Sequence, residues 1–232
     1  MELVSEDSVG RYLAHDVIGA LIEKTHDSRL DELTCQKWLR QSAPKRLIFE
    51  RLYGDLLFTT KGLRVLDVGG GVTNLSRILS ERHDYNLVDL MAHAGDREVE
   101  QALEATRKMI AHVMDWYDYI PVGGYDVVVA NDLLPNVDQR LDLFLQRFLR
   151  AAREVRLSLT FYPDLRFYKT RRENAEEILY MLAWDGEVTA RVLEKYAEYI
   201  IEPDFGLFAE NNASVFPNGR QVCLVRLRGG LN

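Results

Sequence analysis

The pattern of apolar and polar positions predicts that the chain begins with helices. Apolar side chains recur at spacings near four over residues 8–42, with a break at Asp27-Ser28, and this is the period of an amphipathic helix. A further helix over 44–57 is expected to begin at Pro44, because proline is tolerated in the first turn. The sequence therefore places a helical segment ahead of the first strand.

The pattern changes at residue 64, where a short apolar run is followed by glycines. The run over 65–68 is interrupted only by Asp67, which is typical of a strand buried on both faces of a parallel sheet. Gly69-Gly70-Gly71 then allow a sharp turn, and the apolar spacing over 74–82 predicts a helix. Because the amides at a helix N-terminus are unpaired, this turn is suited to hold a carboxylate or a phosphate.

Apolar runs and amphipathic segments alternate over the rest of the chain, which is typical of an α/β protein. The predicted strands lie at 85–90, 109–116, 126–130 and 155–162, with a terminal pair at 206–209 and 221–227. The predicted helices lie at 97–108, 141–149, 173–184 and 187–199.

The composition limits which binding partners and which cellular compartment are expected. The chain has 232 residues, 47% of them hydrophobic, which is enough for one α/β domain or for a domain with a cap. Its formal net charge of -7 disfavours nucleic acid as a partner. Cys35 and Cys223 have no metal-ligand spacing, and neither a signal peptide nor an apolar run of membrane length stands out, so we expect a cytoplasmic protein with no membrane partner. The sequence leaves the oligomeric state open, a homodimer included.

Asp67 decides which ligand the glycine turn suits. It stands two residues before the first glycine, whereas a dinucleotide fingerprint requires a glycine at the position of Asn74. The stretch resembles the first motif of class I S-adenosylmethionine-dependent methyltransferases, Val-Leu-Asp-x-Gly-x-Gly-x-Gly, although Thr73 stands where the family has its third glycine. The resemblance implies that S-adenosylmethionine is the cofactor, that Asp67 lies near its amino group and that the glycines pass beside its methionine part.

Asp89 ends the second predicted strand and extends the resemblance. It lies 18 residues beyond Gly71, a spacing that suits a carboxylate accepting hydrogen bonds from ribose hydroxyls. Leu90 follows it and is assigned to the same site. Because NAD sites use the same device, Asp89 indicates an adenosine ligand without choosing the cofactor. An acid that merely ends a strand is the alternative.

The ends of the third and fourth predicted strands match the family as well. By resemblance, Asp115 accepts from the adenine amine and Trp116 packs against the ring, with a core tryptophan as the alternative. Asn131 and Asp132 follow the fourth strand, where many family members position the substrate or a base. They do not form Asn-Pro-Pro-Tyr, which counts against adenine and glutamine as acceptors.

The resemblance implies a doubly wound, seven-stranded and mostly parallel sheet with an antiparallel last strand. We expect a helical N-terminal extension or cap over 1–60, followed by a Rossmann-like cofactor-binding domain over 61–232. A helical insertion is expected over 163–199. The extension either covers the site or simply packs against the sheet.

The leading interpretation is methyl transfer from S-adenosylmethionine to a small-molecule acceptor, a reaction that depends mostly on positioning. A hydroxyl acceptor must lose a proton, so Asp132 is the candidate general base, with His15 behind it. Tyr12 lies near His15 on the N-terminal extension and is a candidate substrate contact, although a surface position is the alternative for the histidine. No acids and histidines have the spacing of a dedicated metal site, so we expect no metal requirement.

A cluster of cations in the insertion suggests the acceptor's charge. Arg166, Lys169, Arg171 and Arg172 lie close together in a segment expected at the carboxyl edge of the sheet. Because arginine can grip a phosphate or carboxylate in two places, Arg166, Arg171 and Arg172 are candidate substrate contacts. The acceptor is then expected to be an anionic metabolite or a nucleotide-linked sugar, and a solvated charged face is the alternative.

Three other functions stay open. One is a non-catalytic cofactor-binding or partner subunit of the same fold, which the presence of Asp67, Asp89 and Asp115 disfavours. Another is N-methylation of a small amine. The third is an NAD-linked oxidoreductase, which Asn74 disfavours.

Overall fold

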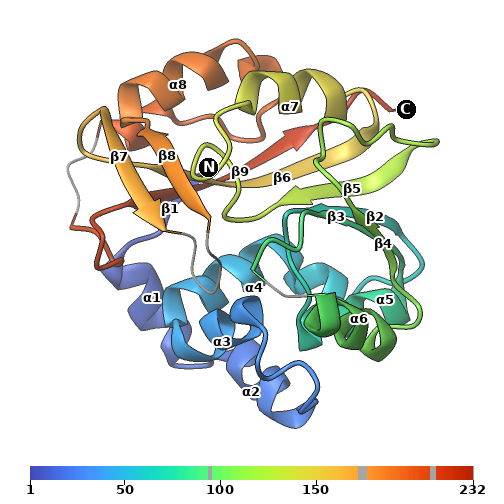
Figure 1. The fold of residues 1–232 in the computed structure, drawn as a ribbon. Helices are drawn as coiled ribbons and strands as arrows, with labels where there is room; N and C mark the ends of the chain where they lie inside the picture. Colours follow the sequence, from blue (N-terminus) through green and yellow to red (C-terminus); the bar gives the residue numbers. More distant parts are fainter. Residues whose placement is uncertain (94–95, 172–176, 210–212, 232) are drawn as a thin grey trace.

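The chain is built around one large sheet. The computed structural model describes residues 1–93, 96–171, 177–209 and 213–231, and within them seven strands follow the order β1-β9-β6-β5-β2-β3-β4 (Figure 1). The strands are β1 (Glu2–Leu3), β2 (Arg64–Val68), β3 (Asp84–Asp89), β4 (Ile110–Val113), β5 (Tyr125–Ala130), β6 (Ala152–Phe161) and β9 (Gln221–Arg228). Neighbours from β4 to β6 run parallel, whereas β9 is antiparallel to β6. The predicted mostly parallel sheet with an antiparallel last strand is confirmed.

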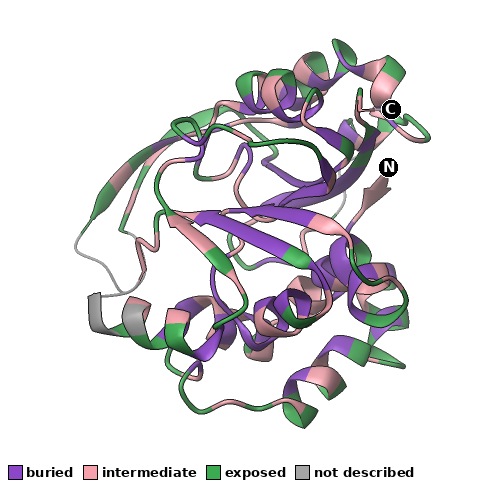
Figure 2. Cartoon of the chain, turned by 90° about the vertical axis from the view of Figure 1, so that its right-hand side faces the viewer, coloured by how far each residue is buried: buried purple, intermediate pink, exposed green. Residues whose placement is uncertain are grey.

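Helices cover both faces of the sheet. One face carries α1 (Glu6–Leu13), α2 (Val17–Lys24), α3 (Thr34–Gln41), α4 (Ala43–Phe58), α5 (Asn74–Arg82) and α6 (Asp96–Ala105), and the other carries α7 (Leu141–Phe148) and α8 (Gly186–Glu194) (Figure 1). Two apolar cores result, and the buried strands lie between them (Figure 2). Val65 packs in one core and its neighbour Leu66 in the other, as expected for a strand buried on both faces.

The segment from β2 to α5 follows the sequence prediction closely. Thr73 is the N-cap of α5, and its side chain accepts hydrogen bonds from the amides of Leu75 and Ser76. The Ser76 hydroxyl in turn accepts from the Thr73 amide, which completes a capping box. Thr73, which stands where the resembled family has its third glycine, therefore has a structural task as the residue that starts the helix.

The antiparallel edge differs from the prediction. The expected strand over 206–209 is a 3-10 helix, η2 (Phe205–Phe208), and the edge position beside β9 is taken by β1. The physical reason is aromatic packing: Phe208 lies edge-on against Phe161, with ring centroids 5.1 Å apart, and is buried without pairing to a strand. The first residues of the chain pair with β9 in its place.

The expected helical insertion contains a β-hairpin. β7 (Arg166–Arg171) pairs antiparallel with β8 (Ile178–Ala183), so the predicted helix over 173–184 is wrong for the part that the structure describes. In β8 the buried Met181 and Ala183 alternate with more exposed neighbours, which is the period of a strand. The predicted helix over 187–199 is confirmed as α8 followed by the short η1 (Ala197–Tyr199).

The predicted third strand, over 109–116, is shorter in the structure, as β4, and the other central strands lie within a few residues of their predictions. Residues 1–60 comprise α1 to α4 together with β1, and their separation as a cap stays a prediction. Among the described helices, none is long and apolar enough to cross a bilayer.

A buried cation joins the first helical segment to the sheet and leads to a stability prediction. The Arg156 side chain in β6 is 2% exposed and donates to Asp55 of α4 at 2.6 and 2.8 Å. Because Arg156 is the buried partner, Arg156→Ala removes these hydrogen bonds together with the volume of a core side chain, and it is expected to lower the free energy of unfolding by about 2 to 5 kcal/mol in urea denaturation.

Arg226→Ala provides the control for this prediction. Arg226 in β9 contacts Glu154, as Arg156 does, but its side chain is 49% exposed. Its replacement by alanine is therefore expected to lower the free energy of unfolding by less than about 1 kcal/mol. Equal losses in the two variants would show that the Arg156 pair does not hold α4 to the sheet.

Candidate functional site

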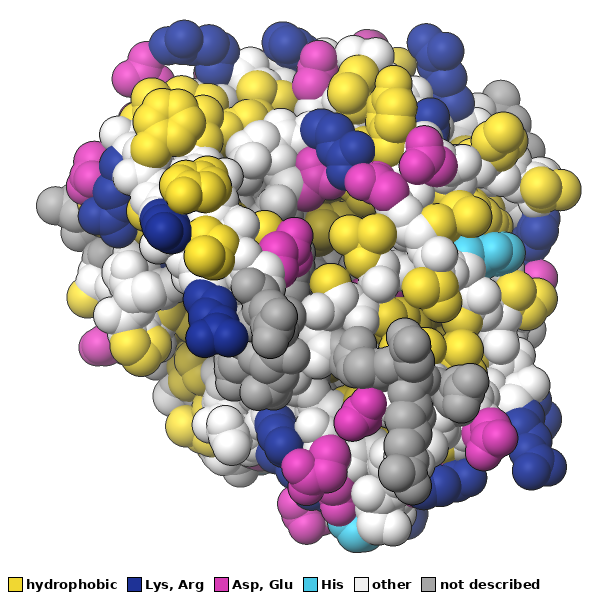
Figure 3. Space-filling model, in the orientation of Figure 1, with side chains coloured by type: hydrophobic (Ala, Val, Ile, Leu, Met, Phe, Trp, Pro, Cys, Tyr) yellow, Lys and Arg dark blue, Asp and Glu magenta, His cyan; other side chains and the backbone are white. Residues whose placement is uncertain are grey.

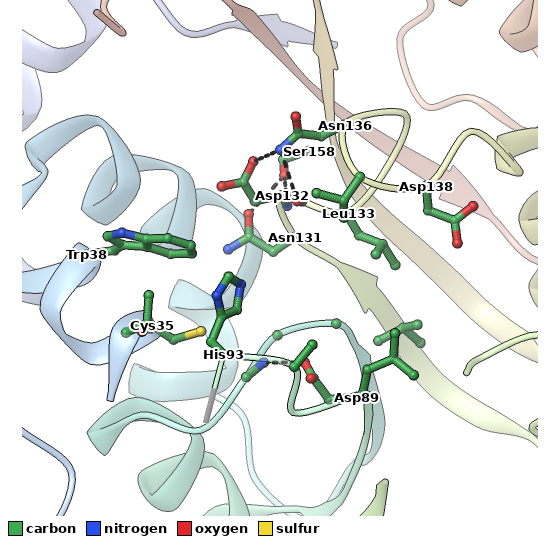
Figure 4. A pocket seen from close by; sticks show the side chains of 18 of the residues that line it. Cys35, Trp38, Asp89, His93, Asn131, Asp132, Leu133, Asn136, Asp138 and Ser158 are labelled. Carbon is green, nitrogen blue, oxygen red and sulfur yellow. Dashed lines mark hydrogen bonds between the residues drawn. The ribbon is translucent and has the colours of Figure 1, made fainter. Parts of the chain in front are cut away.

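A cavity of about 1220 Å³ opens at the carboxyl ends of the parallel strands. Its floor comes from the segments that follow β2, β3, β4 and β5, together with part of β6. One wall comes from α3 and the start of α4, and the opposite wall comes from the β7-β8 hairpin and the loop before β9. Ligands of open α/β sheets bind at this edge, so the cavity is the candidate functional site (Figure 4).

The glycine turn borders the cavity and has no room for side chains. Gly69 and Gly71 have φ values of 74° and 65°, a region that strongly favours glycine. A Cβ atom at Gly71 would lie 2.4 Å from the Cys35 sulfur, and one at Gly70 would lie 2.3 Å from an Asp67 carboxylate oxygen. The backbone conformation therefore favours glycine at 69 and 71, the close approach of α3 excludes a side chain at Gly71, and the Asp67 carboxylate crowds Gly70.

Asp67 lies beneath the turn and does not line the cavity. Its side chain is buried, and the Tyr85 hydroxyl donates to its Oδ2 at 2.5 Å. Burial raises the pKa of Asp67 to about 7, because no cation faces the carboxylate to offset the loss of water. The Asp67 side chain therefore does not reach the cavity, where the predicted contact with the cofactor's amino group would be made. It lies under the turn and supports it.

Asp89 reaches the cavity from the end of β3, as predicted. Its carboxylate accepts from the amide of Gly71 at 3.0 Å and from that of Met91 at 2.6 Å. These bonds fix the acid against the glycine turn of the neighbouring strand. Leu90 also lines the cavity and is 55% exposed, which leaves it available to an apolar surface of a ligand.

Asp115 and Trp116 lie at the end of β4 and both line the cavity. Arg140 donates to both carboxylate oxygens of Asp115 at 3.0 and 2.9 Å, and this pairing lowers the pKa of Asp115 against the effect of burial. Trp116 is 4% exposed and packs on Phe144 of α7. Most of its surface therefore belongs to the core, the alternative that the sequence left open, and its edge reaches the cavity.

Asn131 and Asp132 follow β5 and also line the cavity. Asp132 has a φ of 56°, unusual for a residue other than glycine, and its amide donates to the Ser158 hydroxyl at 2.7 Å. The same hydroxyl donates to the Asn131 amide oxygen at 2.9 Å. Together these bonds hold both side chains in place (Figure 4).

The surroundings of Asp132 disfavour its predicted role as a general base. Its carboxylate contacts the Lys45 ammonium at 2.9 Å and the Arg220 guanidinium at 2.8 Å. These two cations lower the pKa of Asp132 to about 2, even though burial acts in the opposite direction. A carboxylate held in this way is a weak proton acceptor at neutral pH.

The N-terminal candidates lie away from the cavity. His15 is exposed, so the surface alternative describes it, and neither His15 nor Tyr12 lines the cavity. Tyr12 is 8% exposed, and its hydroxyl donates to Asp16 at 2.7 Å, an internal contact between α1 and α2. The sequence prediction failed here because α3 and α4, not α1, form the wall of the cavity.

The cations of the β7-β8 hairpin do not all reach the cavity. Arg171 lines the cavity, whereas Arg166 does not and forms an exposed ion pair with Asp164 at 3.6 Å. Arg172 lies outside the described residues. On the face shown in Figure 3, the Lys and Arg side chains of the described residues are scattered among acidic and apolar ones and form no continuous basic surface.

The cavity also contains residues that the sequence analysis did not single out. These are Lys45 in the first turn of α4, Trp38 in α3, His93 after β3 and Arg220 just before β9. Trp38 and His93 lie edge to face, with ring centroids 5.1 Å apart. Among the described histidines, His93 alone lines the cavity, where it points between Trp38 and Asn131 (Figure 4). No local motif marks these residues, because folding brings them together from distant segments.

Within the described residues, no three His, Cys, Asp or Glu side chains come together as a potential metal site. The expectation of no metal requirement stays a prediction of the sequence.

Comparison with known proteins relates this architecture to solved structures. The sequence matches no family model and no curated protein. The structure is similar to the DhpI-SAH complex, with a TM-score of 0.53 and 15% identity over 98% of this chain and 100% of that one. It is also similar to Thermoplasma acidophilum 1320, with a TM-score of 0.52, 14% identity and coverage of 93% and 99%.

A further similar structure is that of a named enzyme with its cofactor bound. Magnesium protoporphyrin IX methyltransferase from Synechocystis PCC 6803, solved with bound SAM, gives a TM-score of 0.50 and 16% identity, over 92% of this chain and 96% of that one. Because identities are this low, the likeness concerns the fold, and it extends over almost the whole of each chain.

The raised pKa of Asp67 predicts how stability depends on pH. Because the folded protein favours the neutral carboxyl, the stabilisation is complete below the unfolded value of 3.8 and is lost as the pH rises through about 7. The wild-type protein is therefore expected to lose stability relative to Asp67→Asn over this range, measured by urea denaturation. Asp118→Asn, at an exposed position, is the control, and identical pH profiles for wild type and Asp67→Asn would contradict the prediction.

Proposed function

Because the chain has the fold of class I S-adenosylmethionine-dependent methyltransferases, we propose that it transfers the methyl group of S-adenosylmethionine to a small-molecule acceptor. The observation that carries the proposal is the convergence of the glycine turn, Asp89 and Asn131 on one cavity. Two of the similar structures, the DhpI-SAH complex and the Synechocystis methyltransferase, contain SAH and SAM respectively.

The candidate cofactor site comprises the residues on the sheet side of the cavity. They are Gly69, Gly70, Gly71, Asp89, Leu90, Asp115, Trp116 and Asn131. The glycine turn lets a ligand approach the main chain, and Asp89 offers a carboxylate beside it for vicinal hydroxyls. Asp67 supports this site from below and is not proposed to touch the cofactor.

The acceptor site is proposed to lie between the sheet edge and the two walls of the cavity. We assign the role of a cap to residues 1–60, because α3 and α4 of this segment form one wall. The hairpin that forms the other wall contributes Tyr168, Thr170 and Arg171. A cavity enclosed in this way favours a small molecule over a polymer as the acceptor.

We propose a hydroxyl oxygen as the acceptor atom, on an anionic metabolite or a nucleotide-linked sugar. When bound, the cofactor supplies a methyl carbon activated by its sulfonium sulfur, so the new bond to oxygen forms as the carbon–sulfur bond breaks with its electron pair staying on sulfur. A hydroxyl must also release a proton. His93 is the proposed proton acceptor, because it lines the cavity beside Asn131 while Asp132 is held by two cations.

Alternative functions predict different binding and kinetics. N-methylation of a neutral amine would proceed without a base at the methyl-transfer step, so His93 would not affect kcat. A non-catalytic partner subunit would bind S-adenosylhomocysteine without turnover. An NAD-linked enzyme would bind NAD and not S-adenosylhomocysteine. A cytoplasmic location and a homodimer stay predictions of the sequence.

Calorimetric titration with S-adenosylhomocysteine and with NAD tests the cofactor and the role of Asp89. We expect binding of the former alone, and Asp89→Ala is expected to weaken it about 10-fold to 100-fold, because a charged acceptor and the support of the Gly71 amide are lost. Asp84→Ala, at the exposed start of the same strand, is the control. Unchanged affinity in a folded Asp89→Ala variant would remove this residue from the cofactor site.

Replacement of His93 tests the proposed proton acceptor. With an acceptor that supports turnover, His93→Gln is expected to lower kcat about 100-fold or more while S-adenosylhomocysteine affinity stays unchanged. His15→Gln, on the exposed surface of the N-terminal segment, is expected to keep full activity. A His93→Gln variant with wild-type kcat would reject the role and favour an amine acceptor.

A further inference from the structure

Three charged side chains from distant parts of the chain meet in the cavity. Lys45 of α4 contacts Asp132 Oδ2 at 2.9 Å. Arg220, from the loop before β9, donates from Nη1 to Asp132 Oδ1 at 2.8 Å and from Nη2 to Oδ2 at 3.3 Å. Two cations thus share one carboxylate, and all three side chains line the cavity.

This cluster carries one positive charge that it does not itself compensate. The side chains of Lys45, Asp132 and Arg220 are only 20%, 28% and 10% exposed. Burying an uncompensated charge is unfavourable unless another group pairs with it. The other acids of the nearby floor have their own partners, since Asp115 binds Arg140 and Asp89 accepts backbone amides.

The donors of the two cations exceed what Asp132 can accept. Besides Lys45 and Arg220, Asn136 donates to Asp132 Oδ1 at 3.0 Å. The Nε of Arg220 is buried and has no hydrogen-bond partner among the described residues, and Arg220 as a whole is 9% exposed. A buried donor of this kind, on a side chain that lines a cavity, indicates an acceptor that arrives with a ligand.

The cluster is also held rigidly. The Lys45 ammonium lies 3.9 Å from the centroid of the Trp38 ring, and the Arg220 guanidinium lies 4.3 Å from that of Phe216. Asp132 has the positive φ described above and is fixed through Ser158. Strained backbone of this kind recurs at ligand clamps, where it holds side chains in a binding geometry.

We propose that Lys45 and Arg220 form the binding site for a carboxylate or phosphate group of the methyl acceptor, with Asp132 holding the two cations side by side. The inference rests on the proposed function. It states that the methyl acceptor is anionic and that its anionic group binds at Lys45 and Arg220. It moves the expected anion site from the hairpin arginines to residues of α4 and of the loop before β9. Figure 4 shows Asp132 at one end of the site and Asp89 at the other, with Asn131 between them, so the cluster lies apart from the proposed ribose contact.

The cofactor's own carboxylate is the other source of the same chemistry, and the titrations must separate the two. Inorganic phosphate is the probe for the acceptor group, titrated by calorimetry into the whole protein, alone and saturated with S-adenosylhomocysteine. Titration of S-adenosylhomocysteine and of methylthioadenosine, which lacks the amino-acid part, reports on the cofactor's carboxylate.

We expect phosphate to bind the S-adenosylhomocysteine complex, and Arg220→Gln and Lys45→Gln each to weaken phosphate binding about tenfold or more. S-adenosylhomocysteine affinity is expected to stay the same in both variants. Arg191→Gln, which removes a cation whose side chain is 69% exposed on α8, is the control for net charge and is expected to leave phosphate affinity unchanged. Arg220→Lys keeps the charge and is used to check folding by circular dichroism.

Two outcomes would overturn the inference. One is loss of S-adenosylhomocysteine affinity in Arg220→Gln while methylthioadenosine still binds normally, with no phosphate bound to the complex, which would assign the cluster to the cofactor. The other is phosphate binding that is absent in the wild type or equal in all variants. If the wild type bound phosphate through Arg220 but did not bind S-adenosylhomocysteine, the proposed function would fail while the anion site would stand.

Discussion

The rest of the site depends on the exclusion of side chains from the turn between β2 and α5. Two of its glycines have positive φ, and α3 approaches so closely that a Cβ at Gly71 would overlap the Cys35 sulfur. The Gly71 amide of the same turn donates a hydrogen bond to the carboxylate of Asp89 on the next strand. One backbone conformation, which only glycine adopts without strain, therefore positions the end of β2, the wall formed by α3 and the Asp89 carboxylate relative to one another.

Features that depend on local sequence were predicted well. The apolar run of β2, the helix over 74–82 and the acid at the end of β3 follow from periodicity and spacing within about 30 residues of chain. The family resemblance added the seven-stranded, mostly parallel sheet and the antiparallel β9. Even the departure at Thr73 has a local explanation, because a threonine can cap the helix that a third glycine would leave uncapped.

Features that depend on tertiary packing could not be predicted in the same way. The segment 178–183 is apolar enough for either a helix or a strand, and its pairing with β7 decides the outcome. Tyr12 and His15 lie on the predicted N-terminal helices, but the fold turns α3 and α4 towards the cavity in place of α1. Lys45 and Arg220 were missed because their common partner, Asp132, is 87 and 88 residues away in sequence.

Asp67 and Asp132 show how the same residue type acquires opposite properties beside one cavity. Both lose water on folding, but Asp67 faces tyrosine hydroxyls and its pKa rises to about 7, whereas Asp132 faces two cations and its pKa falls to about 2. Sequence position suggested catalysis for the second acid because it follows a strand at the sheet edge. Its partners instead make it the anion that holds Lys45 and Arg220 side by side, so the proposed proton acceptor and the proposed anion site consist of different side chains.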